Sequence, residues 1–119
     1  MIKIRHTGIV TKDLKKSLYF WNKIFKFKVK KDLNESGKTL DNVLQKKNVK
    51  VRTLKLSDDY GNLVELLYFK SPKAIDKNKY FTNSIGITHL SVTVKNINYI
   101  YKKNKKKIKF NSKPITIRR

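Results

Sequence analysis

Three side chains that often bind metal ions occur in apolar, strand-like parts of this sequence. His6 and His89 are its only histidines, and Glu65 is one of its two glutamates. Because side chains alternate along a strand, His6 falls on the mostly apolar side of residues 2–10. By the same rule, Glu65 points the same way as the apolar residues Leu63, Leu67 and Phe69.

Two imidazoles and a carboxylate can act together on a metal ion. An ionised carboxylate among apolar neighbours is costly unless it is paired or bound to a metal. Contributed by three strands, His6, Glu65 and His89 would suit a divalent transition metal and leave open positions for water or substrate. The alternative interpretation is that each histidine is a hydrogen-bonded core residue that happens to recur.

The two histidines occupy equivalent places in an internal repeat. His89 follows His6 by 83 residues, and the same offset aligns Asp13 with Asn96, two residues of a type that caps helices. Each cap precedes apolar residues at helical spacing and then a short alternating stretch. Repeated units imply a shared architecture with pseudo-twofold symmetry, which can bring the two histidines face to face.

Hydropathy patterns predict strands and helices in a β-α-β-β-β order. The predicted segments are a strand at 2–10, a helix capped by Asp13 and running to Phe25, a strand at 25–31, a turn at 35–38, a brief helix at 39–44, and strands at 49–56 and 62–69 around a turn at 58–61. We therefore predict an α+β fold of tandem βαβββ modules. The first module spans residues 1–70, a linker 71–85, and an incomplete second module 86–119.

The formal charge of +22 is the most unusual bulk property. Of the 30 basic residues 26 are lysine, whereas proteins that recognise bases and phosphates rely on the bidentate fork of arginine. The lysines are spread along the chain, and their one dense run, KKNKKK at 102–107, suits the end of a helix. We therefore favour a solvated surface over a basic nucleic-acid-binding protein and predict no nucleic-acid partner.

Cysteine and hydropathy content limit the class of protein further. Without cysteine, the chain has neither disulfides nor a thiolate metal site. Its start, MIKIRHTG, lacks the apolar core of a signal peptide, and no apolar run approaches the roughly 18 residues that a membrane span needs. We predict a cytoplasmic protein without a membrane partner.

The repeated βαβββ unit, with a histidine in the first strand of each copy, is a specific combination. Together with GNLVELLYF at 61–69 and DLKKSLYFWNKIFKFKV at 13–29, it resembles the vicinal oxygen chelate superfamily. That superfamily includes glyoxalase I, methylmalonyl-CoA epimerase, extradiol dioxygenases, and fosfomycin and bleomycin resistance proteins. The resemblance covers residue 2 to about residue 117 and implies a curved mixed sheet, but one such fold hosts several reactions.

The resemblance implies roles for individual residues. His6, Glu65 and His89 would be metal ligands, Glu65 would also be the catalytic base, and the cofactor would be a divalent Ni, Zn, Co, Mn or Fe ion. A fourth ligand, a glutamate, is expected near position 148, beyond the last residue of this sequence. Lys26 is a departure, because relatives commonly have glycine between this helix and the next strand.

The carboxylate at Glu65 favours a glyoxalase-like lyase or isomerase. In such a mechanism a metal polarises two vicinal oxygens of a small-molecule substrate while a carboxylate moves a proton at an enediolate. The alternative is a resistance-type module that binds a small molecule without turnover, in a dimer groove lined by Trp21, Tyr68 and Phe69, although these aromatics better fit a core. We also predict a homodimer, because an incomplete module leaves a sheet edge for a partner to cover.

Overall fold

The chain forms two compact units, Met1–Lys79 and Tyr80–Arg119. The computed structural model describes residues 1–77 and 79–117. Among these residues, all of the β-strands belong to the first unit. None of the helices in the described part of the chain combines the length and the apolar character of a membrane span.

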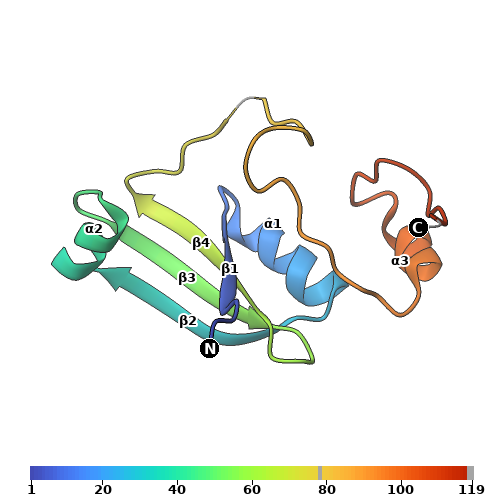
Figure 1. Ribbon diagram of the computed structural model, residues 1–119, viewed down its shortest axis with the longest axis horizontal. Helices are drawn as coiled ribbons and strands as arrows, with labels where there is room; N and C mark the ends of the chain where they lie inside the picture. Colours follow the sequence, from blue (N-terminus) through green and yellow to red (C-terminus); the bar gives the residue numbers. More distant parts are fainter. Residues whose placement is uncertain (78, 118–119) are drawn as a thin grey trace. The chain divides into compact units, whose positions relative to one another are not determined.

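The first unit is built on a mixed four-stranded sheet in the order β1-β4-β3-β2 (Figure 1). Its strands are β1 (His6–Val10), β2 (Lys28–Ser36), β3 (Lys50–Ser57) and β4 (Leu63–Ser71). β1 and β4 are parallel, whereas the β4–β3 and β3–β2 pairs are antiparallel. The predicted α+β class and mixed sheet are confirmed, with β1 starting four residues later than predicted and β2 extending five residues further.

The helix after β1 begins where the sequence predicted. The side chain of Asp13 caps α1 (Leu14–Leu18) by accepting a 3.0 Å hydrogen bond from the backbone N–H of Lys16. The chain continues as a π-helical segment, η1 (Tyr19–Ile24). Lys26 then adopts the left-handed conformation, with φ of 63°, which is the physical reason why glycine suits this junction.

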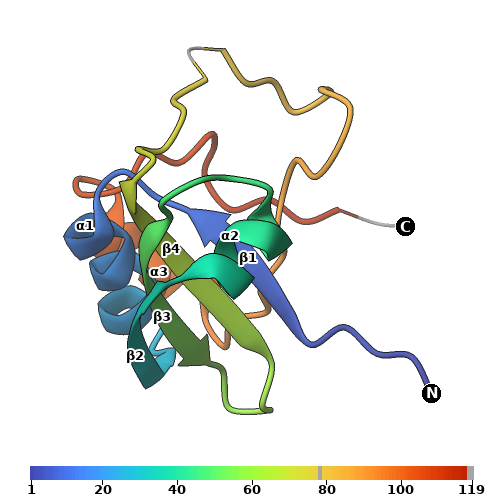
Figure 2. The ribbon, with the colours of Figure 1, turned by 90° about the vertical axis from the view of Figure 1, so that its left-hand side faces the viewer.

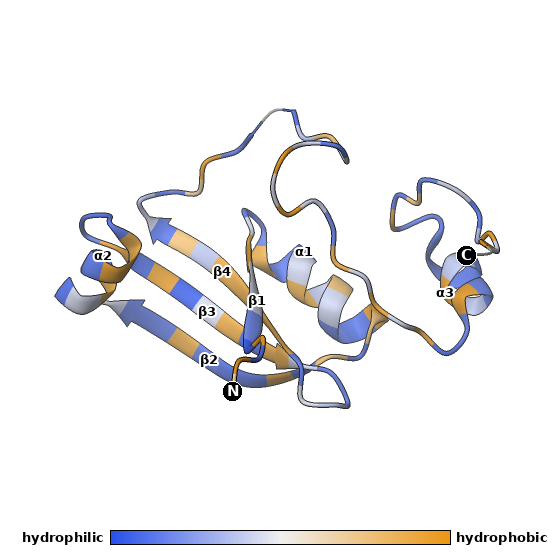
Figure 3. Cartoon of the chain, viewed as in Figure 1, coloured by the Kyte–Doolittle hydropathy of each residue, from blue (hydrophilic) through white to orange (hydrophobic). Residues whose placement is uncertain are grey.

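The core lies between the helical segment α1–η1 and one face of the sheet. Figure 3 shows the apolar and polar residues that alternate along the strands and give the sheet two different faces. Trp21 is buried and makes edge-to-face contacts with Phe20 and Phe27, so the interpretation of Trp21 as a core residue is confirmed. The buried apolar residues of this core are Trp21, Phe27, Leu54, Leu56, Val64 and Leu66.

A tight turn joins β3 to β4 and holds their register. The carboxylate of Asp58 accepts 2.8 Å hydrogen bonds from the backbone N–H groups of Tyr60 and Asn62, and a 2.9 Å bond from the Asn62 side chain. These bonds, foremost the one from the Asn62 side chain, hold the pKa of Asp58 below its usual value. The register that results places Lys55 directly opposite Glu65.

The brief helix predicted at 39–44 is confirmed as α2 (Lys38–Leu44). The carboxylate of Asp41 accepts hydrogen bonds from the backbone N–H groups of Asn48, at 3.1 Å, and Val49, at 2.9 Å. These bonds tie the helix to the start of β3. Figure 2 shows α1 on one side of the sheet and α2 on the other.

The second unit has the predicted helix but lacks the predicted strands. Asn96 caps α3 (Ile97–Asn104) by accepting a 3.1 Å hydrogen bond from the backbone N–H of Tyr99, as expected. The strand predicted from residue 86 and the one predicted after the helix are wrong, since the described residues of this unit contain no strand. In the first copy β1 pairs with β4, whereas no described segment of the second unit pairs with residues 86–95.

Candidate functional site

Glu65 lies in the middle of β4, on the side of the sheet that faces away from the core. Its neighbours Val64 and Leu66 are buried in the core, so strand alternation directs Glu65 to the opposite side. We call this side of the sheet, which carries His6, Thr53, Lys55 and Glu65, the Glu65 face. Glu65 is only 9% exposed, and a carboxylate buried to this degree requires charged or hydrogen-bonding partners.

His6 is the partner that β1 contributes. Its Nδ1 atom lies 3.2 Å from Oε2 of Glu65, and the imidazole is 41% exposed. In the parallel pair, Gly8 is the residue beside Glu65, and His6 lies two positions earlier on the same side of the sheet. Because Gly8 carries no side chain, the imidazole can reach across this position. The structure thus brings together two of the three residues that the sequence suggested as ligands.

Lys55 is the partner that β3 contributes, and sequence reasoning missed it. Its Nζ atom lies 3.8 Å from the same Oε2 of Glu65, and its side chain is mostly buried. Counting outward from the four-residue turn predicted at 58–61 would pair Lys55 with Val64. The structure has a five-residue connection, 58–62, which pairs Ser57 with Leu63 and so places Lys55 opposite Glu65.

Thr53 adds an unsatisfied polar group to the Glu65 face. The residue is 1% exposed, and its Oγ1 has no hydrogen-bond partner among the residues that the structure describes. Thr53 lies two positions before Lys55 and opposite Leu67, so all three side chains lie on one side of the sheet. A buried hydroxyl without a partner is unusual, since most buried polar groups are hydrogen-bonded.

His89 belongs to the second unit, in a segment outside the helices and strands. The residue is exposed, and its Nδ1 atom lies 3.0 Å from the hydroxyl oxygen of Thr88. Within residues 1–77 and 79–117, no group of three or more histidine, cysteine, aspartate or glutamate side chains is arranged to hold a metal. The pair His6 and Glu65 is therefore the part of the predicted ligand set that the described structure assembles.

The geometry of His6 and Glu65 fits two ligands of one ion. Imidazole nitrogen and carboxylate oxygen bind zinc at about 2.0–2.2 Å, so in a tetrahedral site two ligand atoms lie about 3.3–3.6 Å apart. The observed separation of 3.2 Å is slightly shorter than this range, so a small movement of either side chain would admit an ion. The ammonium group of Lys55 would repel a metal ion bound here, because it lies 3.8 Å from the same carboxylate oxygen. A metal ion at this position would have to displace or outcompete that ammonium group.

Comparison with known proteins identifies the family. The model of the Glyoxalase/Bleomycin resistance protein/Dioxygenase superfamily matches residues 3–116. This chain belongs to that superfamily. A crystal structure of a glyoxalase family protein from Bacillus cereus resembles the chain with a TM-score of 0.80 at 18% identity, over 89% of this chain and 72% of the other. No curated protein matches.

Superfamily membership confirms the resemblance proposed from the sequence, and the structural neighbour confirms the fold. At 18% identity, the similarity to this neighbour shows the fold and does not identify the reaction. The chemistry of this superfamily member must therefore be inferred from its own Glu65 face.

Proposed function

We propose that the Glu65 face binds a divalent metal ion and a small molecule with vicinal oxygens, as in a glyoxalase-like lyase or isomerase. The observation that supports this proposal is the contact between His6 and Glu65, two ligand-type side chains from adjacent parallel strands. These two residues would hold the ion, together with His89 as the third ligand that the superfamily resemblance implies. Such an ion would polarise the substrate oxygens and stabilise negative charge on them.

Glu65 is the candidate proton carrier. It is buried beside apolar strand neighbours, which excludes water that would compete for a substrate proton. Lys55 and His6 contact the same oxygen of Glu65 and thereby restrict the orientation of the carboxylate. We propose that Glu65 takes a proton from one substrate carbon and returns it to the neighbouring carbon, with Lys55 as a positioning residue.

A second candidate function is the binding of a small molecule without turnover. The observation that favours it is the position of Lys55, whose ammonium group brings positive charge to the Glu65 face without a metal. An ammonium group can itself pair with an anionic oxygen of a ligand. In this case Glu65 would orient Lys55 rather than transfer a proton.

Metal content tests the first proposal. We expect elemental analysis of protein purified without chelator to find about one Ni, Zn, Co, Mn or Fe ion per chain, and His6→Ala to lose it. A separate His89→Ala variant tests the third ligand, and circular dichroism verifies that both variants are folded. Absence of metal from the purified protein, with no heat of binding when each of these ions is added, would contradict the proposal.

A Lys55→Met variant distinguishes the two functions. If the Glu65 face is a metal site, removal of the neighbouring ammonium should raise metal affinity about tenfold, because like charges a few ångströms apart repel by more than about 1 kcal/mol. If Lys55 itself binds the ligand, the variant gains no metal affinity and loses ligand affinity. Lys47→Met is the matched control, because Lys47 is exposed and lies outside this face.

The remaining expectations concern location and assembly. We propose a cytoplasmic homodimer with a small-molecule ligand, in which a second copy pairs with an edge of the sheet. β1 and β2 are the edge strands of the sheet in the first unit and offer unpaired backbone groups. Sizing chromatography with light scattering should give twice the chain mass, and a monomer across the micromolar range would contradict the dimer.

A further inference from the structure

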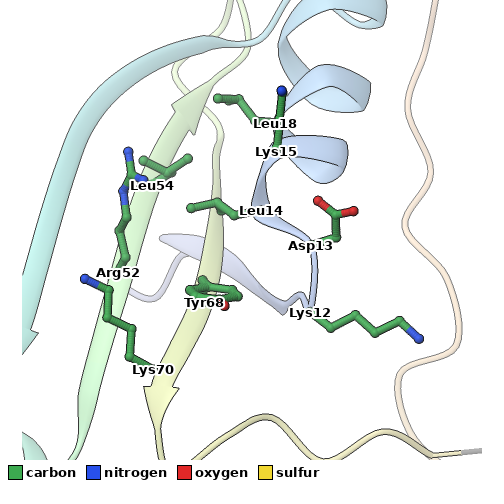
Figure 4. Close-up of a pocket in the computed structure, with 9 residues that line it drawn as sticks. All are labelled: Lys12, Asp13, Leu14, Lys15, Leu18, Arg52, Leu54, Tyr68 and Lys70. Carbon is green, nitrogen blue, oxygen red and sulfur yellow. The ribbon is translucent and has the colours of Figure 1, made fainter.

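A hollow lies on the core side of the sheet, away from the Glu65 face. Its volume is about 550 Å³, and it lies between the start of α1 and the strands β3 and β4 (Figure 4). Pockets of about 300–1,000 Å³ accommodate small organic ligands. Side chains alternate along β3 and β4, and Leu54 directly precedes Lys55 of the Glu65 face. Leu54 and the other strand residues of the hollow, such as Tyr68, therefore lie on the opposite side of the sheet from Glu65.

The floor of this hollow is apolar and aromatic. Leu14 and Leu18 of α1 face Leu54 of β3 across it, with Tyr68 of β4 beside them (Figure 4). Tyr68 is half-buried, and among the described residues its hydroxyl has no hydrogen-bond partner. A floor of this kind can bury a flat apolar body and leave one hydroxyl available to a polar substituent.

The rim of the hollow is mostly cationic. Four basic residues and one acidic residue line it: Lys12, Lys15, Arg52, Lys70 and Asp13, whose carboxylate accepts the capping hydrogen bond from the Lys16 N–H. Two of them are neutralised, because Lys12 pairs with Asp76 at 2.8 Å and Arg52 forms a bidentate pair with Asp32. Lys15 and Lys70 have no carboxylate partner among the described residues.

Lys70 is one of the two lining cations that no carboxylate among the described residues neutralises. Its Nζ atom donates only a long hydrogen bond of 3.4 Å, to Oδ1 of Asn34. A second hollow, of about 360 Å³, shares Lys12, Tyr68 and Lys70 with the first and adds Lys73. Lys70 and Tyr68 thus line both hollows, and the Lys70 ammonium group is held only by the long bond to Asn34.

We propose that this hollow binds an amphipathic carboxylate, with an aromatic or branched apolar body against Leu14, Leu54 and Tyr68 and its carboxylate at Lys70. The proposal goes beyond the function assigned to the Glu65 face and does not depend on it. A neutral ligand would lose the ion pair, and an inorganic anion would lose the apolar contact. Selectivity for molecules that combine both features is the signature of this site.

Binding of 2-naphthoate tests the proposal, with 2-naphthylmethanol as the neutral analogue. We expect saturable binding of 2-naphthoate at moderate salt, at least several-fold tighter than the neutral analogue, with nuclear Overhauser contacts from the ring to the methyl groups of Leu14 and Leu54. Lys70→Glu should weaken binding about tenfold, because a charge-assisted contact contributes about 1.5 kcal/mol or more. Both substituted and original chains are compared by circular dichroism to verify the fold.

Lys47→Glu is the matched control, since it makes the same charge change at an exposed loop position outside the hollow. Equal weakening by the two variants would show general attraction to a chain of charge +22 and would overturn the proposal. Equal affinity for the neutral analogue, or no saturable binding, would overturn it as well.

Discussion

The two copies of the repeated pattern keep different parts of the same architecture. In both, an Asx side chain accepts a hydrogen bond from the backbone N–H three residues later: Asp13 from Lys16 and Asn96 from Tyr99. Only the first copy has strands within the described residues. A helix satisfies its backbone from its own residues, whereas a strand requires a partner that is distant in sequence. The difference separates what a segment encodes locally from what it needs from the rest of the fold.

Hydrogen exchange should show the largest difference between the copies. The backbone N–H groups of β3 lie between two paired strands, so we expect them to exchange at least about 10³-fold more slowly than in an unfolded chain. Residues 86–95, which have a strand-like sequence but no assigned strand, should exchange close to the unfolded rate. Strong protection of 86–95 would show that a pairing partner exists in solution and would remove the contrast.

The second-largest difference between the copies should be the loss of stability when an apolar side chain is truncated. Leu56 of β3 is fully buried in the core, so Leu56→Ala should lower the free energy of unfolding by about 2–5 kcal/mol. Val92 occupies the place in the second copy that Ile9 occupies in β1, yet it is exposed. We expect Val92→Ala to change stability by less than about 0.5 kcal/mol. Urea unfolding measures both, and a similar loss for both variants would contradict the structural difference.

The two helix caps provide the prediction in which the copies behave alike. Asp13→Ala and Asn96→Ala should each destabilise their own helix by about 1 kcal/mol, because each leaves a backbone N–H without its acceptor. Asp13→Asn and Asn96→Asp are matched controls that retain the capping oxygen. Chemical-shift changes confined to α1 or α3 identify the helix affected, and an effect at one cap only would break the equivalence.

Substitution by glycine at equivalent positions should raise stability in the first copy and fail to raise it in the second. Lys26 has a left-handed backbone, so Lys26→Gly should stabilise the first unit by about 0.5–1 kcal/mol. Lys109 is its counterpart, and its backbone is not left-handed, so Lys109→Gly should be neutral or destabilising by about 0.4–1 kcal/mol through the entropy of the unfolded chain. Thermal unfolding of the two variants measures the difference, and the same sign for both would contradict it.

Most of the first unit was predictable from residue patterns. Period-two alternation predicted its strands, and the Asx caps predicted two helices, since these signals arise within a few residues. The π-helical geometry of Tyr19–Ile24 was not predicted, because the apolar spacing from Leu14 to Phe25 suits an ordinary helix equally well. The strand at 86 was wrong because alternation reports a suitable surface and not a pairing partner.

The candidate site shows the same division between local and distant information. Glu65 was predictable as an outlier in an apolar strand, and His6 was predictable through its equivalence to His89 in the repeat. Lys55 required the hairpin register, which depends on the turn held by Asp58. Thr53 required knowledge of burial, because its hydroxyl is unusual only when nothing around it can donate or accept a hydrogen bond.

By itself, the sequence determined the α+β class, the helix caps, the superfamily resemblance and the residue types on each side of every strand, because short-range alternation and capping encode these properties. Tertiary structure alone decided which of these residues meet. It placed His6 and Lys55 on the same oxygen of Glu65, and it turned Tyr68 and Lys70 toward a separate hollow on the other side of the sheet. Strand pairing brings together residues far apart in the chain, and no local pattern records that pairing.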